Sequence, residues 1–312
     1  GGAFSIYFEN DLFSGTDRYY TNGARVAWST RDLNRFDDSP TARQFGPLLR
    51  QVEMINRPKF LRNFAITLGQ EMFTPDNTET PNLVLNDRPY AGWLYLGLGV
   101  IWKNETTRNA ALIQLGVVGP WSLAEETQRF IHRVRGLALP QGWDNQIQNE
   151  LGAVLAFEHK RRWRLGEYGS GFASDVQPYA GFGVGNVLTY ANVGAEFRFG
   201  YNLPDDFGTD LISSAGSTPT PLASGAGPSR LGVHAFARAD GRAVARNIFL
   251  DGNTFEDSHS ISKRWTVGQV SAGLSINYRN TKLTYAAVYR TREFYGQREP
   301  QVFGAVTLTI AY

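Results

Sequence analysis

The sequence contains no cysteine, no long apolar run and almost no excess charge of either sign. Without cysteine, it cannot form a disulfide scaffold, a thiolate metal site or a cysteine nucleophile. A membrane-spanning helix needs about 20 consecutive apolar residues, and no stretch of the chain supplies them, which excludes a helical membrane protein. Lys and Arg number 31 against 29 Asp and Glu, and this net charge of +2 gives no sign of a nucleic-acid-binding protein.

Glycine and aromatic residues, by contrast, are abundant. The 312 residues include 33 Gly, 20 Phe, 14 Tyr and 7 Trp. So many aromatic residues exclude a disordered chain, which is depleted in them. High glycine together with many aromatics and no cysteine is unusual for a soluble enzyme, but it is typical of a β-barrel.

Apolar and small or polar residues alternate along much of the chain. The alternation is clearest in the segments 4–11, 94–103, 282–290 and 302–312. It is typical of outer-membrane barrel strands, which turn apolar side chains to lipid and small or polar ones to the lumen. A soluble β-sandwich also alternates, but the segments here run to about 11–16 residues, whereas ordinary strands have about 5–6. Their length favours the membrane barrel.

We predict an all-β fold, a twelve-stranded antiparallel transmembrane β-barrel that forms a single outer-membrane domain over residues 1–312. The predicted strands are 2–12, 19–31, 62–73, 92–103, 108–118, 151–163, 173–186, 190–201, 231–249, 263–278, 282–293 and 301–312. With both termini in the periplasm, the outer loops are 13–18, 74–91, 119–150, 187–189, 250–262 and 294–300. The connections 32–61 and 202–230 then lie on the periplasmic side, where turns are normally short.

The clearest helical pattern covers about 122–135, within the predicted outer loop 119–150. Ser122 and Glu125 have the spacing of a capping box, and Gly136 supplies a helix stop. One predicted face is mostly apolar, and it comprises Leu123, Thr127, Phe130, Ile131 and Val134. A second face is polar by its i, i+3 and i+4 spacing, and it comprises Glu125, Gln128, His132 and Arg135. The helix therefore presents a histidine, His132, on a polar stripe.

Three polar residues are expected at the same end of the barrel as His132. Strand parity directs Asp11 and Thr21 inward, so that they meet inside the outer mouth, whereas Asn10 has the parity of the lipid-facing side. A carboxylate, an amide and a hydroxyl near a histidine suggest hydrolysis by a His-activated water. A hard cation on these oxygen ligands would polarise the scissile carbonyl. The alternative is hydrogen bonding among rim residues that stiffens the loops.

Several segments resemble the lipid A 3′-O-deacylase family, also called LpxR. They are FENDLFSGTDRYYTNG (8–23), LGQEMFTP (68–75), NDRPYAGWLYLG (86–97), LGVVGPWSLAEETQRFIHRVRG (115–136) and PQGWDNQ (140–146). The resemblance extends from the first strand to the last and is densest from 8 to 146. Family members can carry a lysine after the third strand and an acidic residue beyond the helix histidine, whereas this chain has 75–78 (PDNT) and 137–139 (LAL) at those places.

The resemblance implies an outer-membrane enzyme that hydrolyses the 3′-linked acyloxyacyl ester of lipid A and depends on a divalent cation, normally Ca²⁺. His132 would be the general base, and Asn10 and Asp11 would hold the cation or orient the histidine. Thr21 matches a hydroxyl position of the family site. The expected location is the outer membrane of a Gram-negative bacterium, where the protein, expected to be a monomer, would meet lipid A or lipopolysaccharide in the outer leaflet.

Four arginines in the predicted outer loops suit the phosphates of lipid A, because guanidinium binds phosphate bidentately. They are Arg18, Arg88, Arg133 and Arg135. The alternative is that they are solvated or form ion pairs with Asp17, Asp87 and Glu125.

Two other functions stay open at this point. One is a calcium-dependent outer-membrane phospholipase, which would use the same chemistry. The other is a non-enzymatic porin or structural barrel, although a lumen filled by Tyr7, Glu9, Arg25 and Tyr95 would conduct poorly.

Overall fold

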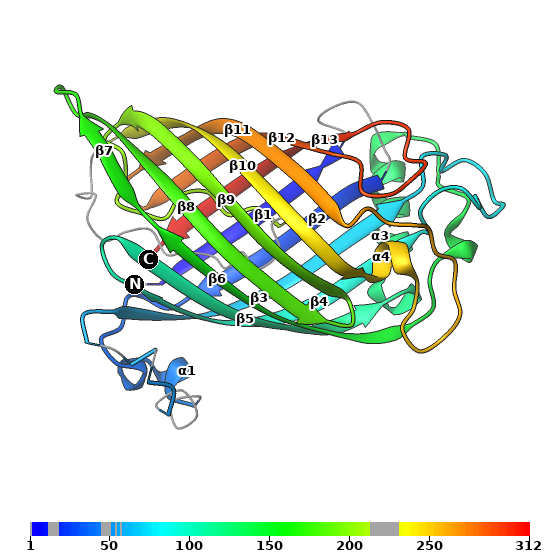
Figure 1. Cartoon of the computed structure of the whole chain (residues 1–312), viewed down its shortest axis with the longest axis horizontal. Coiled ribbons are helices and arrows are strands. Elements are labelled where there is room, and N and C mark those ends of the chain that lie inside the picture. The colour runs from blue at the N-terminus through cyan, green and yellow to red at the C-terminus, as the bar shows by residue number, and fades with distance from the viewer. Residues whose placement is uncertain (1, 12–18, 45–50, 54, 57, 213–230) are drawn as a thin grey trace.

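The structure is a computed structural model that describes residues 2–11, 19–44, 51–53, 55–56, 58–212 and 231–312. Its strands form a barrel (Figure 1). They are β1 (Ala3–Asn10), β2 (Tyr19–Ser29), β3 (Leu61–Thr74), β4 (Ala91–Lys103), β5 (Thr107–Val118), β6 (Glu150–Arg161), β7 (Trp163–Glu167), β8 (Phe172–Gly185), β9 (Leu188–Tyr201), β10 (Gly232–Asn247), β11 (Thr266–Tyr278), β12 (Thr281–Arg290) and β13 (Gln301–Ala311).

The barrel is closed and antiparallel. Consecutive strands pair with each other except β6 and β7, β1 pairs with β13, and β6 pairs with β8. Because β6 and β7 are separated only by Arg162 and both pair with β8, they count as one spanning strand. The prediction of a twelve-stranded antiparallel barrel is confirmed, and the observed strands follow the predicted ranges closely.

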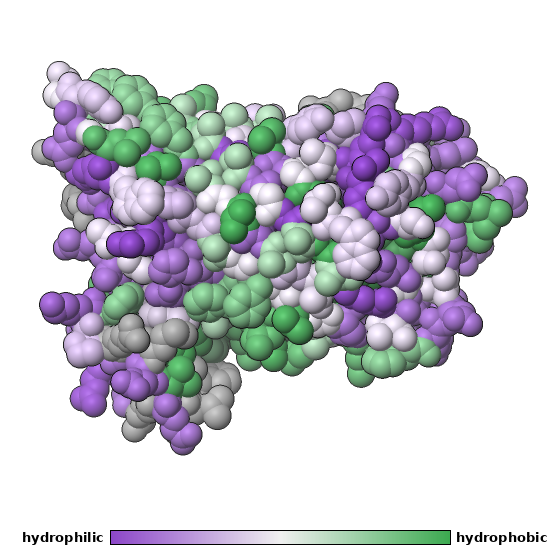
Figure 2. Space-filling view, in the orientation of Figure 1, coloured by the Kyte–Doolittle hydropathy of each residue, from purple (hydrophilic) through white to green (hydrophobic). Residues whose placement is uncertain are grey.

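The alternation places side chains as predicted. In β1, Phe4 is 41% exposed on the outward face, whereas Tyr7 is 3% exposed and faces the lumen. Leu68, Leu96 and Leu115 continue the exposed apolar surface on β3, β4 and β5. Figure 2 shows apolar residues on the wall between two ends at which hydrophilic residues dominate. This is the surface that a barrel presents to a bilayer.

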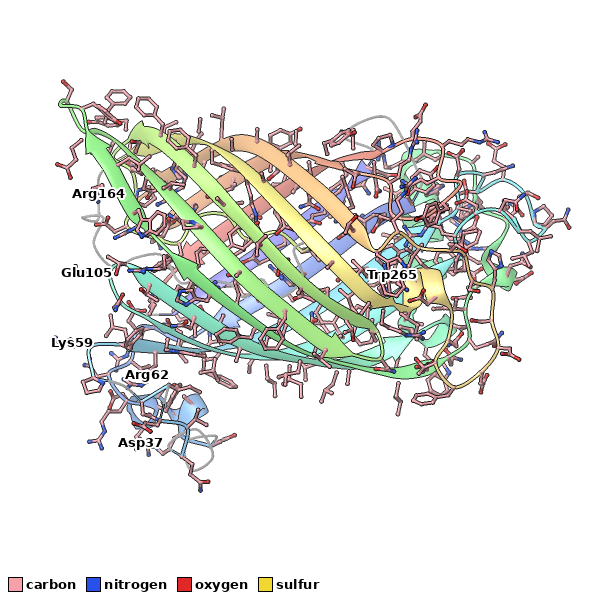
Figure 3. All side chains as sticks on the ribbon, in the orientation of Figure 1. Asp37, Lys59, Arg62, Glu105, Arg164 and Trp265 are labelled. Carbon is pink, nitrogen blue, oxygen red and sulfur yellow. The ribbon has the colours of Figure 1, made fainter. Side chains whose placement is uncertain are left out.

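The end of the barrel that carries both termini, here called the inner end, bears a small lobe (Figures 1 and 3). This inner lobe comprises the described residues of 33–60 and contains η2 (Phe36–Asp38) and α1 (Pro40–Arg43). Its Leu33, Phe36 and Ile55 pack against Phe64 of β3 and Trp102 of β4, which lie on the outward-facing side of their strands. The lobe accounts for one long inner connection, and it explains why Trp102 is buried although its parity turns it to lipid.

The second long inner connection enters the lumen. Residues 202–212 contact side chains of strands around the barrel: Asp206 accepts from Lys282 of β12 (2.6 Å), the N–H of Ile212 donates to Glu9 of β1 (2.6 Å), and the Phe207 carbonyl accepts from Lys160 of β6 (3.1 Å). Only a segment inside the barrel can reach all three strands.

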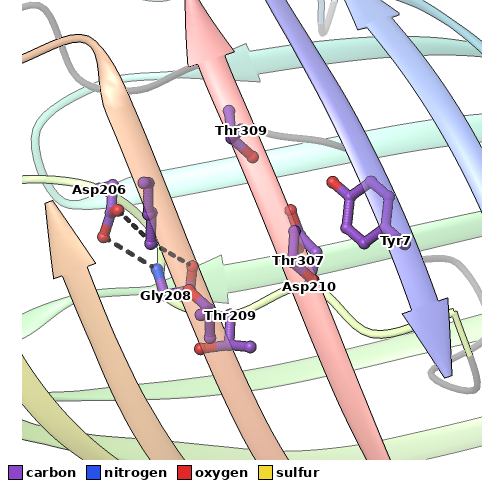
Figure 4. Close-up of a pocket in the computed structure, with 9 residues that line it drawn as sticks. Tyr7, Asp206, Gly208, Thr209, Asp210, Thr307 and Thr309 are labelled. Carbon is purple, nitrogen blue, oxygen red and sulfur yellow. Dashed lines mark hydrogen bonds and ion pairs between the residues drawn. The ribbon is translucent and has the colours of Figure 1, made fainter.

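This segment, here called the lumen plug, leaves little space at the inner end. The cavity between the plug, β1, β12 and β13 measures about 30 Å³ (Figure 4), which is room for about one water molecule. The backbone of Gly208 has φ +78°, and a Cβ there would lie 2.4 Å from the Glu196 carboxylate. The close approach of plug and wall therefore requires glycine at this position.

The opposite end, here called the outer end, carries η3 (Pro120–Ser122), α3 (Ala124–Arg135), η4 (Trp143–Asn145) and α4 (Ile248–Asp251) (Figure 1). None of the described helices has the length and apolar character required to cross a membrane.

Candidate active site

A row of paired residues crosses four strands at the outer end of the wall. Asn10 of β1 pairs with Asn22 of β2, Asn22 pairs with Met72 of β3, and Met72 pairs with Gly92 of β4. Their neighbours Phe73 and Trp93 belong to the lumen core, so Met72 and Gly92 face outward. Asn10 has the outward parity that the sequence predicts, yet it is buried, as Asn22 is. The wall is therefore covered here on its membrane side.

Thr21 belongs to the same outward face, which contradicts its predicted inward direction. The pairing of β2 with β3 shifts register between Tyr20 and Asn22, so Thr21 is the extra residue of a β-bulge. Tyr20 keeps its place in the lumen core, whereas the Thr21 hydroxyl lies 2.7 Å from the hydroxyl of Thr74. Thr74 shares the outward face of Met72. The predicted location of Thr21 inside the mouth is wrong because the bulge reverses the parity.

The helix α3 packs on this outward face. Its buried residues Ala124, Gln128 and His132 recur at every fourth position and form one stripe. Ala124 belongs to a buried cluster with Met72, so the stripe faces the wall. Gly92 allows the close approach, because a Cβ at this position would lie 2.0 Å from the Ser122 hydroxyl oxygen and 2.4 Å from the Ala124 Cβ.

The loop after the helix fixes α3 through an indole hydrogen bond. Trp143 is fully buried, and its Nε1–H donates to the Gln128 side-chain oxygen at 2.7 Å. The indole also packs on Tyr90, with ring centroids 4.9 Å apart. The side of the helix that carries Gln128 and His132 is therefore its packed face, since the Gln128 amide has a partner in the loop.

The predicted apolar face of α3 points away from the protein. Phe130 and Val134 are 65% and 70% exposed, and Leu123 is exposed beside them. The predicted capping box is wrong, because the Ser122 hydroxyl donates to the Gly119 carbonyl in η3 and the helix begins at Ala124. The predicted stop at Gly136 is confirmed, with φ +67°.

That stop also orients His132. The N–H of Leu137 donates to the His132 carbonyl at 2.9 Å, and the N–H of Gly136 donates to the Arg133 carbonyl at 3.3 Å, which together form a Schellman motif. The chain turns back after Gly136, and this turn brings the Ala138 carbonyl into hydrogen-bond contact with Nδ1 of His132. A carbonyl only accepts, so Nδ1 carries a proton, and in the neutral imidazole the lone pair of a base is then on Nε2.

Asn10 is the last residue of β1 and Asp11 follows it directly, and both are buried. With Thr21 they offer amide, carboxylate and hydroxyl oxygens, a donor set that suits a hard cation such as Ca²⁺. Within the described part of the chain, no group of three or more His, Asp or Glu side chains gathers as a metal cluster. Among the described residues, a cation at this place would therefore take further ligands from carbonyls or water.

The four predicted phosphate-binding arginines have different surroundings. Arg133 and Arg135 are exposed in the last turn of α3, whereas Arg18 lies outside the described residues. Arg88 is buried, donates to Glu293 at 3.3 Å and lies over the Phe73 ring. Burial lowers the pKa of Arg88 below its ordinary value, although the Glu293 carboxylate acts in the opposite direction. Its main contact is thus an internal ion pair.

Sequence reasoning missed the residues that build the floor of the site. Asn22, Met72, Thr74 and Gly92 received no role, although Gly92 carried a signal, because it is a glycine at an outward position in a strand of outward leucines. Nothing in the sequence indicates the role of the Ala138 carbonyl, because every residue has a backbone carbonyl.

A family model and one solved structure agree with this architecture. The model of the family described as outer membrane protein LpxR matches residues 1–312. LpxR from Salmonella typhimurium is similar in structure, with a TM-score of 0.80 and 19% identity over 99% of this chain and 100% of that one. The β domain of the Bordetella autotransporter BrkA has a TM-score of 0.45 and 11% identity over 100% of this chain and 99% of that one. No curated protein sequence matches the chain.

Proposed function

The chain belongs to the LpxR family of outer-membrane proteins, and from that premise we propose that it is a lipid A deacylase. The observation that carries the proposal is the position of His132. It lies on the stripe of α3 that packs on the wall, and the same outward face of the wall carries Asn10 and Thr21. The substrate bond is the 3′-linked acyloxyacyl ester of lipid A.

His132 acts as the general base. Its Nδ1–H is engaged by the Ala138 carbonyl, so the imidazole presents Nε2 to a water molecule and removes a proton as that water attacks the ester carbonyl carbon. The carbonyl carbon becomes tetrahedral, and its bond to the sugar oxygen then breaks. The sugar oxygen takes the proton from the imidazolium, which releases a fatty acid and a free sugar hydroxyl and returns His132 to its neutral form.

Asn10 and Asp11 would hold the divalent cation through their side-chain oxygens, with Ca²⁺ as the proposed ion. When bound, it supplies Lewis acidity, which polarises an ester carbonyl and stabilises developing negative charge. Thr21 positions the substrate or water from the adjacent bulge, where Thr74 fixes its hydroxyl.

The site opens sideways to the outer leaflet. The exposed residues Phe130 and Val134 give α3 an apolar face, with Trp121 of η3 also exposed before it, as in helices that lie at a membrane interface. An ester at the boundary of headgroup and acyl chain can then reach His132 without leaving the membrane. Arg133 and Arg135, at the end of the same helix, suit the lipid A phosphates.

The lumen plug argues against the porin alternative, since residues 202–212 run inside the lumen from Lys282, at the start of β12, to Glu9, near the outer end of β1. The test of the deacylase proposal is mass spectrometry of lipid A from cells that express the wild type, His132→Ala or His159→Ala. His159 is the matched control, because it bonds Asn109 at the inner end of the wall.

We expect loss of the 3′-linked acyl group with the wild type and with His159→Ala, and unchanged lipid A with His132→Ala. If wild-type cells keep full lipid A acylation but lose acyl chains from phospholipids, the protein is a phospholipase and the deacylase proposal is wrong. Retained activity in folded His132→Ala protein would remove His132 from the mechanism.

A further inference from the structure

The inner lobe contains a cavity that the proposed reaction does not use. It measures about 560 Å³ and opens between η2 and the segment that leads into β3. The residues that matter for its chemistry are Arg35, Phe36, Asp37, Lys59, Phe60 and Arg62. A volume of this size falls in the range of small-molecule sites, which is about 300–1,000 Å³.

The cavity lies beside the membrane, not below the lumen. The lobe packs on Phe64 and Trp102, which face outward from the barrel wall. Figure 3 shows Asp37, Lys59 and Arg62 together on the lobe, to one side of the barrel. Since the wall above the lobe faces lipid, the cavity opens where the headgroups of the inner leaflet of the outer membrane lie.

Of the three basic residues among the described lining of the cavity, two are available to a ligand. Arg35 and Lys59 are exposed, and no described side chain forms an ion pair with either of them. Arg62, in contrast, is buried and holds the lobe on the wall, donating to the carbonyls of Asn34 (2.6 Å), Phe60 (2.8 Å) and Ile55 (3.0 Å).

The backbone of Lys59 has φ +73°, a conformation that costs a lysine energy and that is retained where neighbouring structure imposes it. It stands between Pro58 and Phe60, which also line the cavity. The Lys59 ammonium group therefore has apolar neighbours, Pro58 and Phe60, so the cavity offers both charge and apolar contact.

We propose that this cavity binds one glycerophospholipid of the inner leaflet. The phosphate lies between Arg35 and Lys59, and Pro58 and Phe60 contact the glycerol and the first part of an acyl chain. Unpaired cations select a phosphate. The apolar lining and the position beside the bilayer favour a phosphate that is attached to acyl chains over a free anion.

Native mass spectrometry of the full chain in detergent tests the proposal, with titration of dioleoylphosphatidylethanolamine, glycerophosphoethanolamine and inorganic phosphate. The variant is Arg35→Gln/Lys59→Gln, and the matched control is Arg31→Gln/Arg161→Gln, two exposed arginines outside the cavity. We expect one tightly held phospholipid on the wild type and on the control. We expect about 30-fold weaker binding by the variant, the effect of removing two basic residues at a lipid surface.

Equal phospholipid binding by the variant and the control would overturn the proposal. So would binding of the headgroup or of inorganic phosphate as tight as that of the lipid, because the ligand would then be a soluble anion. If the double variant does not fold, the single variants Arg35→Gln and Lys59→Gln, each expected to weaken binding about 5-fold, replace it. Lipid A hydrolysis is expected to be unchanged throughout, so failure here is distinguishable from failure of the proposed function.

Discussion

Replacing Gly136 by alanine tests the link between the helix stop and the histidine. Gly136 has φ +67°, and a Cβ there meets no atom within 4 Å. The substitution therefore adds no clash, and its cost is the left-handed backbone alone, about 1–2 kcal/mol for a residue with a side chain. The Schellman turn that carries the Ala138 carbonyl to His132 bears that cost.

If the whole cost falls on the orientation of His132, kcat for lipid A hydrolysis drops about 5- to 30-fold, with KM little changed. The assay is the rate of fatty acid release from lipid A in mixed micelles. Gly136→Asn should recover most of the rate, because asparagine tolerates the left-handed region.

Gly169→Ala is the matched control, because Gly169 has φ +75° and equally open surroundings, but lies in the turn between β7 and β8. Equal rates for Gly136→Ala and Gly169→Ala would refute the reasoning, since the two substitutions carry the same backbone cost and only one lies beside the histidine.

Three further perturbations test the helix anchor, the cation and the plug. Gln128→Leu leaves the buried Trp143 indole without its acceptor, which should destabilise the outer loop by about 1–3 kcal/mol and speed its proteolysis; unchanged proteolysis would contradict the anchor. EDTA should abolish hydrolysis and Ca²⁺ restore it, with Asp11→Asn weakening Ca²⁺ binding in calorimetry; full activity in EDTA would exclude the cation. Asp206→Ala removes the carboxylate that Lys282 contacts at 2.6 Å, which should cost about 3–5 kcal/mol in urea unfolding; an unchanged midpoint would show that the plug adds no stability.

The strands could be predicted because alternation is enforced at each residue by lipid on one side and the lumen on the other. Phe4 and Tyr7, for example, lie on the faces that their positions indicate. Thr21 could not be placed in the same way, since a bulge adds one residue and reverses the parity, and the adjacent residues show no pattern that marks it.

The face of α3 could not be predicted because the sequence does not say which solvent surrounds a helix. Apolar residues at helical spacing usually mark the packed face, but beside a membrane they can face lipid. Phe130 and Val134 are exposed on the outer face of α3, and the buried Gln128 accepts from Trp143 through its side-chain oxygen. Long-range partners of this kind are set by the tertiary structure.

The wall of β3 is covered at both ends, by α3 over Met72 and by the inner lobe over Phe64. Phe64 and Met72 are eight positions apart, which is about 26 Å along the strand, or about 20 Å of membrane depth at a tilt of about 40°. Because the apolar band of such barrels is about 25 Å tall, part of α3 or of the inner lobe falls within that band beside this strand, and Phe130 and Val134 give α3 an apolar outer face there. The lipids next to His132 therefore meet the helix as well as the wall, so the rate of hydrolysis should depend on the thickness of the surrounding membrane.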